Sequence, residues 1–202
     1  SRAEGSGPMN MEPVRFGVIG CGLMGREFAS VSMRWLHLAC ELPRPVIVAA
    51  CDLSPKNLDW FRQVPDTKYF YSDYHELLAN PEVEAVYCAV PHHLHAQVYG
   101  DVIRAGKHLI GEKPFGMDLA ACEEVEAAMA GRPEVFVRCA SEFPFYPAVQ
   151  QMVKWYREGA FGQIIEARFA IKHSSDMDLA KPINWKRMRA ANGEYGCMGD
   201  LG

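Results

Sequence analysis

Short apolar runs alternate with amphipathic segments from residue 14 to residue 140. Runs such as VRFGVI and AVYCAV are short, rich in β-branched residues and bounded by glycine or proline, which is typical of strands buried on both faces. The intervening segments repeat apolar residues every three or four positions, as amphipathic helices do. The strands predicted in this way span residues 14–20, 46–52, 68–71, 85–90, 107–114 and 134–140.

Turn and cap residues mark the helices between these strands. Ser54 and Pro55 stand where an N-cap and a first helical residue belong, and Asp118 stands at another N-cap. Gly106 follows the last periodic residue of its helix, where a C-terminal stop is expected. The stripe expected to face the core from the first helix holds Met24, Phe28, Val31 and Trp35. Strands and helices alternating at this spacing predict an α/β fold with a doubly wound parallel sheet over residues 13–140.

The pattern changes after residue 140. Residues 147–162 have the period of a helix that ends at Gly159, and residues 163–173 alternate apolar and polar positions like a half-exposed antiparallel strand. We therefore expect residues 141–202 to begin a second, incomplete α+β domain, because one strand is not a stable sheet. A partnerless apolar strand favours a homo-oligomer through this sheet, or disorder after about residue 160. Residues 1–12 read as a disordered lead or tag.

Composition narrows the class of protein. The 202 residues carry a net charge of −4, which gives no support for binding to nucleic acid or to an anionic membrane. No signal peptide is visible and no apolar run reaches the roughly 18 residues of a membrane helix, so a cytoplasmic protein is expected. The 7 cysteines lack C-x-x-C spacing and sit mostly in apolar runs, as small buried residues in a reducing compartment do.

A glycine-rich turn joins the first strand to the first helix, in the segment GVIGCGLMGREF. In a Gly-x-Gly-x-x-Gly turn the first glycine permits the tight turn, the second lets a pyrophosphate approach the backbone, and the third allows close packing of helix and strand. We interpret the turn as a dinucleotide-binding loop, with a purely structural glycine turn as the alternative. The residues expected to contact the cofactor here are Gly20, Cys21, Gly22, Leu23, Met24 and Gly25.

Asp52 ends the second strand and is followed by Leu53. A carboxylate at this place accepts the ribose hydroxyls of the adenosine and repels a 2′-phosphate, which favours NAD over NADP. Two alternatives remain open. Asp52 merely precedes a helix cap, or it turns away and lets Ser54 and Lys56 hold a phosphate.

Two further segments follow strands, where ligands bind in open α/β sheets. In AVPHHLHAQ, contacts to the cofactor or substrate are expected from Ala89, Val90, Pro91, His92 and His95. His92 and His95 share a helix face, but zinc takes three or four ligands and no third acidic or sulfur ligand is evident, so no metal is expected. Surface or capping histidines are the remaining alternative.

Lys113 lies in the second of these segments, GEKPFG, between Glu112 and Pro114, and all three residues are expected to contact the cofactor. A lysine partly buried beside a cofactor can have a lowered pKa and act as a proton donor or acceptor. The alternative is a surface salt bridge to Glu112, which is geometrically poor because adjacent strand residues point to opposite faces.

Together these segments resemble the Gfo/Idh/MocA family of glucose–fructose oxidoreductase, inositol 2-dehydrogenase and their relatives. The matching stretches are FGVIGCGLMG, VAACDLSPKN, YSDYHELLANPEVEAVYCAVPHHLHAQ, AGKHLIGEKPFG, YPAVQQMVKWYREGAFGQI and NGEYGCMGDLG. The resemblance implies a Rossmann domain that binds NAD or NADP, followed by a domain built on a large, mostly antiparallel sheet. It also implies hydride transfer between the nicotinamide and a hydroxyl carbon of a sugar, cyclitol or similar polyol.

The resemblance implies roles for individual residues. Lys113 matches the lysine of the family's Glu-Lys-Pro segment, where the peptide before Pro114 is expected to be cis. Trp185 resembles a tryptophan near the cofactor that is usually followed by arginine, whereas here Lys186 intervenes. Relatives often carry an arginine where this chain has Pro144, and Glu142 is the expected substitute contact.

The family's Asp-x-Gly-x-His motif matches Asp200, Leu201 and Gly202, with its histidine falling past residue 202. The chain is therefore expected to be the N-terminal portion of a longer enzyme, in which Lys113 and Asp200 are the catalytic residues. A nucleotide-binding fragment or regulatory module without turnover is the alternative.

Overall fold

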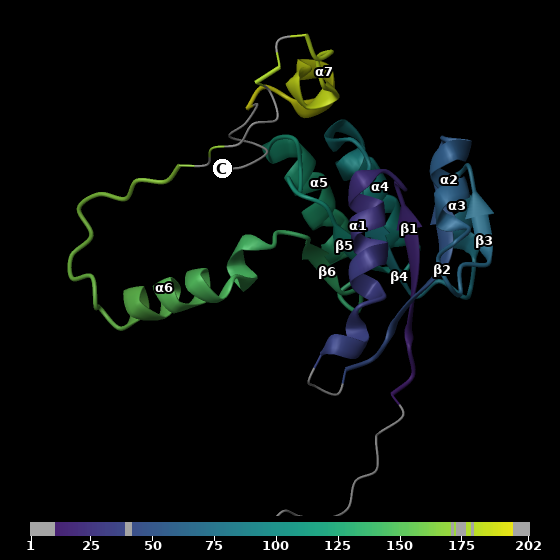
Figure 1. Cartoon of the computed structure of the whole chain (residues 1–202), viewed down its shortest axis with the longest axis horizontal. Coiled ribbons are helices and arrows are strands. Elements are labelled where there is room, and N and C mark those ends of the chain that lie inside the picture. The colour runs from purple at the N-terminus through teal and green to yellow at the C-terminus, as the bar shows by residue number, and fades with distance from the viewer. Residues whose placement is uncertain (1–10, 39–41, 171, 173–176, 179, 196–202) are drawn as a thin grey trace, which may run out of the picture.

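The computed structural model describes residues 11–38, 42–170, 172, 177–178 and 180–195. A six-stranded sheet forms its centre, with the strand order β3-β2-β1-β4-β5-β6 and every neighbouring pair parallel (Figure 1). All of the predicted strands up to residue 140 form, most of them one to four residues shorter than expected. They are β1 Val14–Ile19, β2 Pro45–Cys51, β3 Tyr69–Tyr71, β4 Ala85–Cys88, β5 His108–Gly111 and β6 Val137–Cys139.

The helices begin and end close to the predicted caps. Pro55 opens its helix after Ser54, the Asp118 carboxylate accepts the Ala121 N–H at 2.9 Å, and Gly106 has a positive φ of 72°. The α-helices are α1 Leu23–Ser32, α2 Pro55–Phe61, α3 Tyr74–Ala79, α4 His95–Arg104, α5 Leu119–Ala130, α6 Pro147–Arg157 and α7 Arg189–Asn192. The 3-10 helices are η1 Trp35–His37, η2 His92–Leu94, η3 Phe143–Phe145 and η4 Trp185–Arg187.

The two faces of the sheet carry separate hydrophobic cores. Side chains of α3, α4 and α5, including Leu77, Val102 and Val125, pack against one face, and side chains of α1 and α2, including Ala29 and Phe61, pack against the other. Helices on both faces, with the strand order reversing between β1 and β4, give the doubly wound Rossmann fold. The fold class predicted for this part of the chain is confirmed.

Helix α1 buries only part of the predicted stripe. Phe28 packs against the core and stacks on Tyr87 with ring centroids 4.2 Å apart, whereas Met24 and Val31 are exposed. Gly25, Ala29 and Ser32 are the buried residues of the helix. At Gly25 an added Cβ would come within 2.2 Å of the Gly20 carbonyl oxygen, so only the smallest residue fits this part of the interface.

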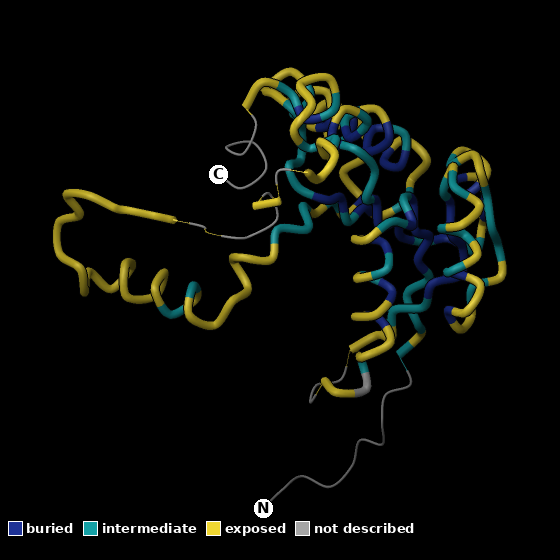
Figure 2. The backbone as a smooth tube through the Cα atoms, turned by 45° about the horizontal axis from the view of Figure 1, so that its top comes forward, coloured by how far each residue is buried: buried dark blue, intermediate teal, exposed yellow. Residues whose placement is uncertain are grey.

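The chain beyond η3 leaves the sheet as an arm formed by α6 and the residues up to 170 (Figure 1). The helix predicted within residues 147–162 forms, but its apolar side chains Met152, Val153, Trp155 and Tyr156 are exposed, as Figure 2 shows for the whole arm. The strand predicted over residues 163–173 is absent from 163–170 and 172, because no described segment supplies the ladder hydrogen bonds that a strand needs. The α+β sheet expected after residue 140 is not seen in the described residues.

The helices of the described residues are too short or too polar for any of them to cross a bilayer. The cysteines among them, Cys21, Cys51, Cys88, Cys122 and Cys139, are free thiols, three buried and two half-buried.

Candidate functional site

The glycine-rich turn lies where the strand order reverses, at the carboxyl ends of β1 and β4. Gly20 has φ 91°, and a Cβ added there would come within 2.5 Å of the Ala89 carbonyl oxygen. A Cβ on Gly25 would meet the Gly20 carbonyl oxygen at 2.2 Å. Both positions therefore require glycine, and together they hold the turn and the start of α1 against the exit of β4.

Gly22 differs from these two glycines because its side-chain position faces open space. An added Cβ would have no atom of the described residues within 4 Å. Gly22 is also the N-cap of α1 and provides no side-chain cap, so the first backbone N–H groups of the helix have no intrahelical partner. Free volume beside outward-facing N–H groups at a helix N-terminus fits a pyrophosphate group.

Asp52 fixes this turn from the end of β2. Its Oδ2 accepts the backbone N–H of Cys21 at 2.7 Å and the Asn57 side-chain amide at 3.1 Å, while its Oδ1 accepts the Ser54 N–H at 2.7 Å. An ionised carboxylate offers about four acceptor positions, so about one remains for a ligand hydroxyl. The Asp52 side chain can therefore hold the Ser54 N–H at the start of α2 and still accept a ligand hydroxyl.

The exit of β4 is covered by the segment that contains η4 and α7. His92 is buried, its Nδ1 is hydrogen-bonded to the Asn192 side-chain oxygen, and its ring meets the Trp185 ring edge-on with centroids 4.9 Å apart. Gly193 approaches Met117 beyond β5. The structure thus brings Trp185 beside the β4 exit, about a hundred residues away along the chain.

The peptide between Lys113 and Pro114 is cis, as the resemblance implied. Lys113 is half-buried, and its backbone N–H donates to the Glu112 carboxylate at 3.1 Å. Glu112 is 8% exposed, and its Oε1 accepts the Tyr87 hydroxyl at 2.6 Å. Burial and this hydrogen bond raise the pKa of Tyr87, so the phenol remains a donor. Among the described contacts there is no ion pair between the Glu112 carboxylate and the Lys113 side chain, which was the alternative to a functional lysine. The Glu112 carboxylate instead accepts the Lys113 backbone N–H from inside the protein.

His95 supports the same peptide from α4. It is fully buried, with Nδ1 lying 2.7 Å from the Pro114 carbonyl oxygen and Nε2 lying 2.9 Å from the Val90 carbonyl oxygen. Both ring nitrogens face backbone carbonyls, so His95 joins two loops at the sheet edge, while its contact with a cofactor stays a prediction.

Burial lowers the pKa of His95 below its ordinary value of 6.5, although the carbonyls of Pro114 and Val90 and the Glu112 charge act in the opposite direction. The unfolded chain, with the ordinary pKa, then binds more protons than the folded chain between the two pKa values. We expect the free energy of unfolding to decrease as the pH falls from about 7 to about 5. His95→Gln should show a smaller decrease in urea unfolding over this range, and equal slopes in both proteins would contradict the expectation.

The remaining predicted residues fall into three groups. Leu23, Met24 and Leu53 are exposed around the glycine turn and Asp52, where a ligand has access. Glu142 is exposed beyond β6 and hydrogen-bonds Tyr146, which raises the pKa of that phenol, so it is occupied away from the turn. Asp200 lies outside the described residues.

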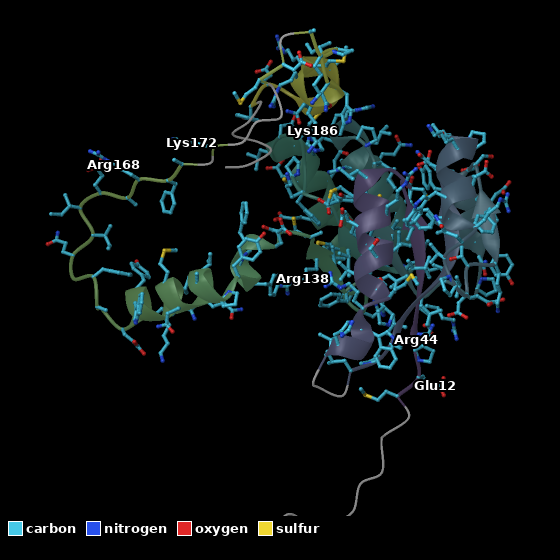
Figure 3. The ribbon with its side chains drawn as sticks, in the orientation of Figure 1. Glu12, Arg44, Arg138, Arg168, Lys172 and Lys186 are labelled. Atoms are coloured by element: carbon cyan, nitrogen blue, oxygen red, sulfur yellow. The ribbon has the colours of Figure 1, made fainter. Side chains whose placement is uncertain are left out.

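Two basic residues of the C-terminal half lie far apart. Figure 3 shows Lys186, which belongs to η4, near the end of α5, whereas Arg168 lies at the outer side of the arm. Within the described residues, no cluster of three or more histidine, cysteine or acidic side chains is arranged to hold a metal ion. His92 and His95, the pair considered as metal ligands, instead bond Asn192 and backbone carbonyls.

Sequence reasoning missed the residues that support the site from behind. Tyr99 donates from its hydroxyl to the Glu112 carbonyl at 2.7 Å, and Tyr87 and Asn192 have the partners given above. A signal was present for the tyrosines, since a phenol in a buried strand or helix face must find a hydrogen-bond partner. Asn192 carried no such signal, because its partner His92 is distant in sequence.

Comparison with known proteins gives matches over most of the chain. The Gfo/Idh/MocA family model, described as an oxidoreductase family with an NAD-binding Rossmann fold, matches residues 14–138. Levoglucosan dehydrogenase of Pseudarthrobacter phenanthrenivorans is 27% identical over 196 residues, covering 95% of this chain and 49% of that protein. Human trans-1,2-dihydrobenzene-1,2-diol dehydrogenase is 31% identical over 159 residues, covering 77% of this chain and 45% of that protein. The chain thus spans about half the length of these curated relatives, or less.

Solved structures show the same fold. A levoglucosan dehydrogenase in complex with NADH and L-sorbose superposes with a TM-score of 0.82 at 24% identity, covering 95% of this chain and 51% of that chain. The apo scyllo-inositol dehydrogenase of Lactobacillus casei gives a TM-score of 0.67 at 22% identity, covering 76% and 44%.

Proposed function

This chain belongs to the Gfo/Idh/MocA family of oxidoreductases with an NAD-binding Rossmann fold, and on that premise we propose that its sheet edge binds NAD or NADP and presents Lys113 to a polyol for hydride transfer. One observation carries the proposal. The glycine turn, with open space at Gly22, and the Lys113–Pro114 peptide occur at the carboxyl ends of β1 and β5, on either side of β4.

Each part of this edge has a task in the proposal. The turn and the N-terminus of α1 bind the pyrophosphate, and the Asp52 carboxylate accepts an adenosine ribose hydroxyl. Trp185 and the β4 exit face the nicotinamide half. When bound, the nicotinamide supplies the hydride chemistry. Lys113 moves a proton to or from the substrate oxygen, and Asp200 assists there.

The relatives indicate the substrate class. Levoglucosan, dihydrobenzenediol and inositol, which give their names to the matched dehydrogenases, are all rings that carry hydroxyl groups. A ring polyol, either sugar or cyclitol, is therefore the substrate we propose. An assay of the whole protein at 340 nm, the absorbance of NADH, against a panel of such polyols tests this, and nucleotide binding without turnover of any of them would support a binding module instead.

Asp52 should control the choice between the two dinucleotides. Asp52→Ala removes the acceptor for the ribose and the anchor of the Cys21 N–H, so we expect NADH affinity to fall about tenfold or more. NADPH affinity should fall less, because the repulsion of the 2′-phosphate is lost as well. Asn57→Ala, which removes a neighbouring hydrogen bond but keeps the carboxylate, is the matched control. Unchanged NADH affinity in folded Asp52→Ala, measured by calorimetry, would contradict this role.

The arm should drive self-association. Its exposed apolar side chains include Trp155, Tyr156, Ile165 and Phe169, of which Ile165 is 95% exposed. Exposed apolar side chains of this number favour contact with another copy. We expect the sedimentation coefficient of the chain to rise with concentration and Trp155→Glu with Ile165→Glu to reduce that rise. A monomer at every concentration would argue against the homo-oligomer.

A further inference from the structure

Three buried side chains hold the backbone on both sides of the cis peptide that carries Lys113. The Glu112 carboxylate accepts the Lys113 N–H at 3.1 Å, the Tyr99 hydroxyl donates to the Glu112 carbonyl at 2.7 Å, and His95 Nδ1 lies 2.7 Å from the Pro114 carbonyl. Tyr99 and His95 are fully buried and Glu112 nearly so. The backbone around Lys113 is therefore fixed by side chains that no ligand reaches.

His95 differs from the other two because it also contacts a second loop. Its Nε2 lies 2.9 Å from the carbonyl oxygen of Val90, at the exit of β4, while its Nδ1 contacts the carbonyl oxygen of Pro114, at the exit of β5. Both partners are carbonyl oxygens, which only accept. A neutral imidazole carries one N–H and can donate to one of them, whereas an imidazolium can donate to both.

The surroundings of the ring decide which form is present. The titratable and charged groups around it are His92 and His93 from η2, Tyr99 from α4, and Glu112 and Lys113 from the exit of β5. Burial lowers the pKa of His95, so the ring is neutral at neutral pH and donates to a single carbonyl. The Nδ1 contact with the Pro114 carbonyl is the shorter of the two, at 2.7 Å against 2.9 Å, as expected if Nδ1 carries the proton.

We propose that His95 is a positioning residue for Lys113, whose Nδ1–H holds the Pro114 carbonyl and thereby sets the place of the Lys113 side chain at the sheet edge. The catalytic meaning of this role rests on the function proposed above, but the hydrogen bond itself does not.

The tautomer of His95 gives the first test. In ¹⁵N-histidine-labelled protein, long-range ¹⁵N–¹H correlation distinguishes the Nδ1–H tautomer, the Nε2–H tautomer and the imidazolium, with His95→Gln assigning the signal. The Nδ1–H tautomer at neutral pH would support the proposal. The imidazolium would overturn it, because both carbonyls would then be held alike, and so would the Nε2–H tautomer, because the ring would then donate to Val90.

Two conservative variants separate positioning from packing. The side-chain amide nitrogen of asparagine reaches about the place of imidazole Nδ1, and that of glutamine about the place of Nε2. His95→Asn should therefore keep the bond to Pro114, His95→Gln should keep the bond to Val90, and His95→Leu should keep neither. Urea unfolding establishes which variants are folded, and all readouts are taken on the folded proteins.

The readout is the rate at which acetic anhydride modifies Lys113, measured by peptide mass spectrometry against Lys154 on α6, whose side chain is 64% exposed. We expect His95→Asn to match the unchanged protein, and His95→Gln and His95→Leu to differ by about 2- to 10-fold, the range expected when one hydrogen bond is lost. Two results would overturn the proposal. In the first, His95→Gln and not His95→Asn reacts at the rate of the unchanged protein; in the second, all the proteins react at the same rate.

Binding of NADH and of NADPH is measured on the same proteins. If the unchanged protein bound neither NADH nor NADPH, the proposed function would fail, while the tautomer and the labelling rates would still report on His95. The two outcomes are therefore distinguishable.

Discussion

Replacing Lys113 with methionine is expected to lower the turnover of the whole protein by about 10²- to 10⁴-fold, the range that a positioned proton donor or acceptor contributes. The side chain follows β5 at the ligand edge of the sheet, and its backbone is fixed by Glu112. Methionine has a similar length and leaves the buried supports in place. Binding of NADH should therefore change little, because the glycine turn that we propose as the pyrophosphate site lies across β4.

Lys113→Arg separates charge from proton transfer. Arginine keeps the positive charge, but its guanidinium does not give up a proton in proteins, so it should not restore turnover. Lys186→Met, in the segment that covers the site, is a control for the loss of a lysine nearby. The measurements are kcat from absorbance at 340 nm and the NADH dissociation constant from calorimetry. A Lys113→Met protein with nearly unchanged kcat would show that the proton passes through another group.

Gly25→Ala is expected to destabilise the chain by about 2–4 kcal/mol, the range of steric overpacking and severe backbone clashes. The added methyl group would lie 2.2 Å from the Gly20 carbonyl oxygen, which is backbone and cannot rotate away. Either α1 moves from the sheet or the turn opens, and both expose parts of the core around Ala29.

Gly22→Ala is the matched control. It adds the same methyl group to the same turn, but no described atom lies within 4 Å of it, so the expected cost is that of alanine in place of glycine at the N-cap, about 0.5–1 kcal/mol. Urea unfolding measures both variants. Equal stability of Gly25→Ala and Gly22→Ala would contradict the close packing described at Gly25.

The sheet was predictable from the sequence because its signals are local. Buried strands such as Ala85–Cys88 are short apolar runs, and the end of α4 at Gly106 and the start of α5 at Asp118 follow from backbone conformation and capping. The stripe of α1 was predicted correctly at Phe28 and wrongly at Met24, because hydrophobicity ranks Met24 above Gly25, whereas the contact with the Gly20 carbonyl admits only the smaller residue. The periodic pattern of apolar residues along a helix does not show where two backbones pack closely, as they do at Gly25.

The sequence predicted the candidate site residues that follow strands, but not the buried residues that hold the backbone behind them. Gly20, Asp52 and Lys113 follow strands, and strand ends gather at one edge in any parallel sheet. The inward roles of His95 and Glu112 depend on partners at Pro114, Val90 and Tyr87, which no spacing rule connects. The strand expected over residues 163–173 illustrates the same limit, since its alternating pattern is local but its pairing partner is not.

Calorimetric titration with NADH, compared between the unchanged chain and Gly22→Ala, tests the account most directly. We predict saturable binding by the unchanged chain and binding weakened about tenfold or more in folded Gly22→Ala. The reason is that the added methyl group would occupy the space that the pyrophosphate needs. Failure of the folded, unchanged chain to bind either NADH or NADPH would contradict the account.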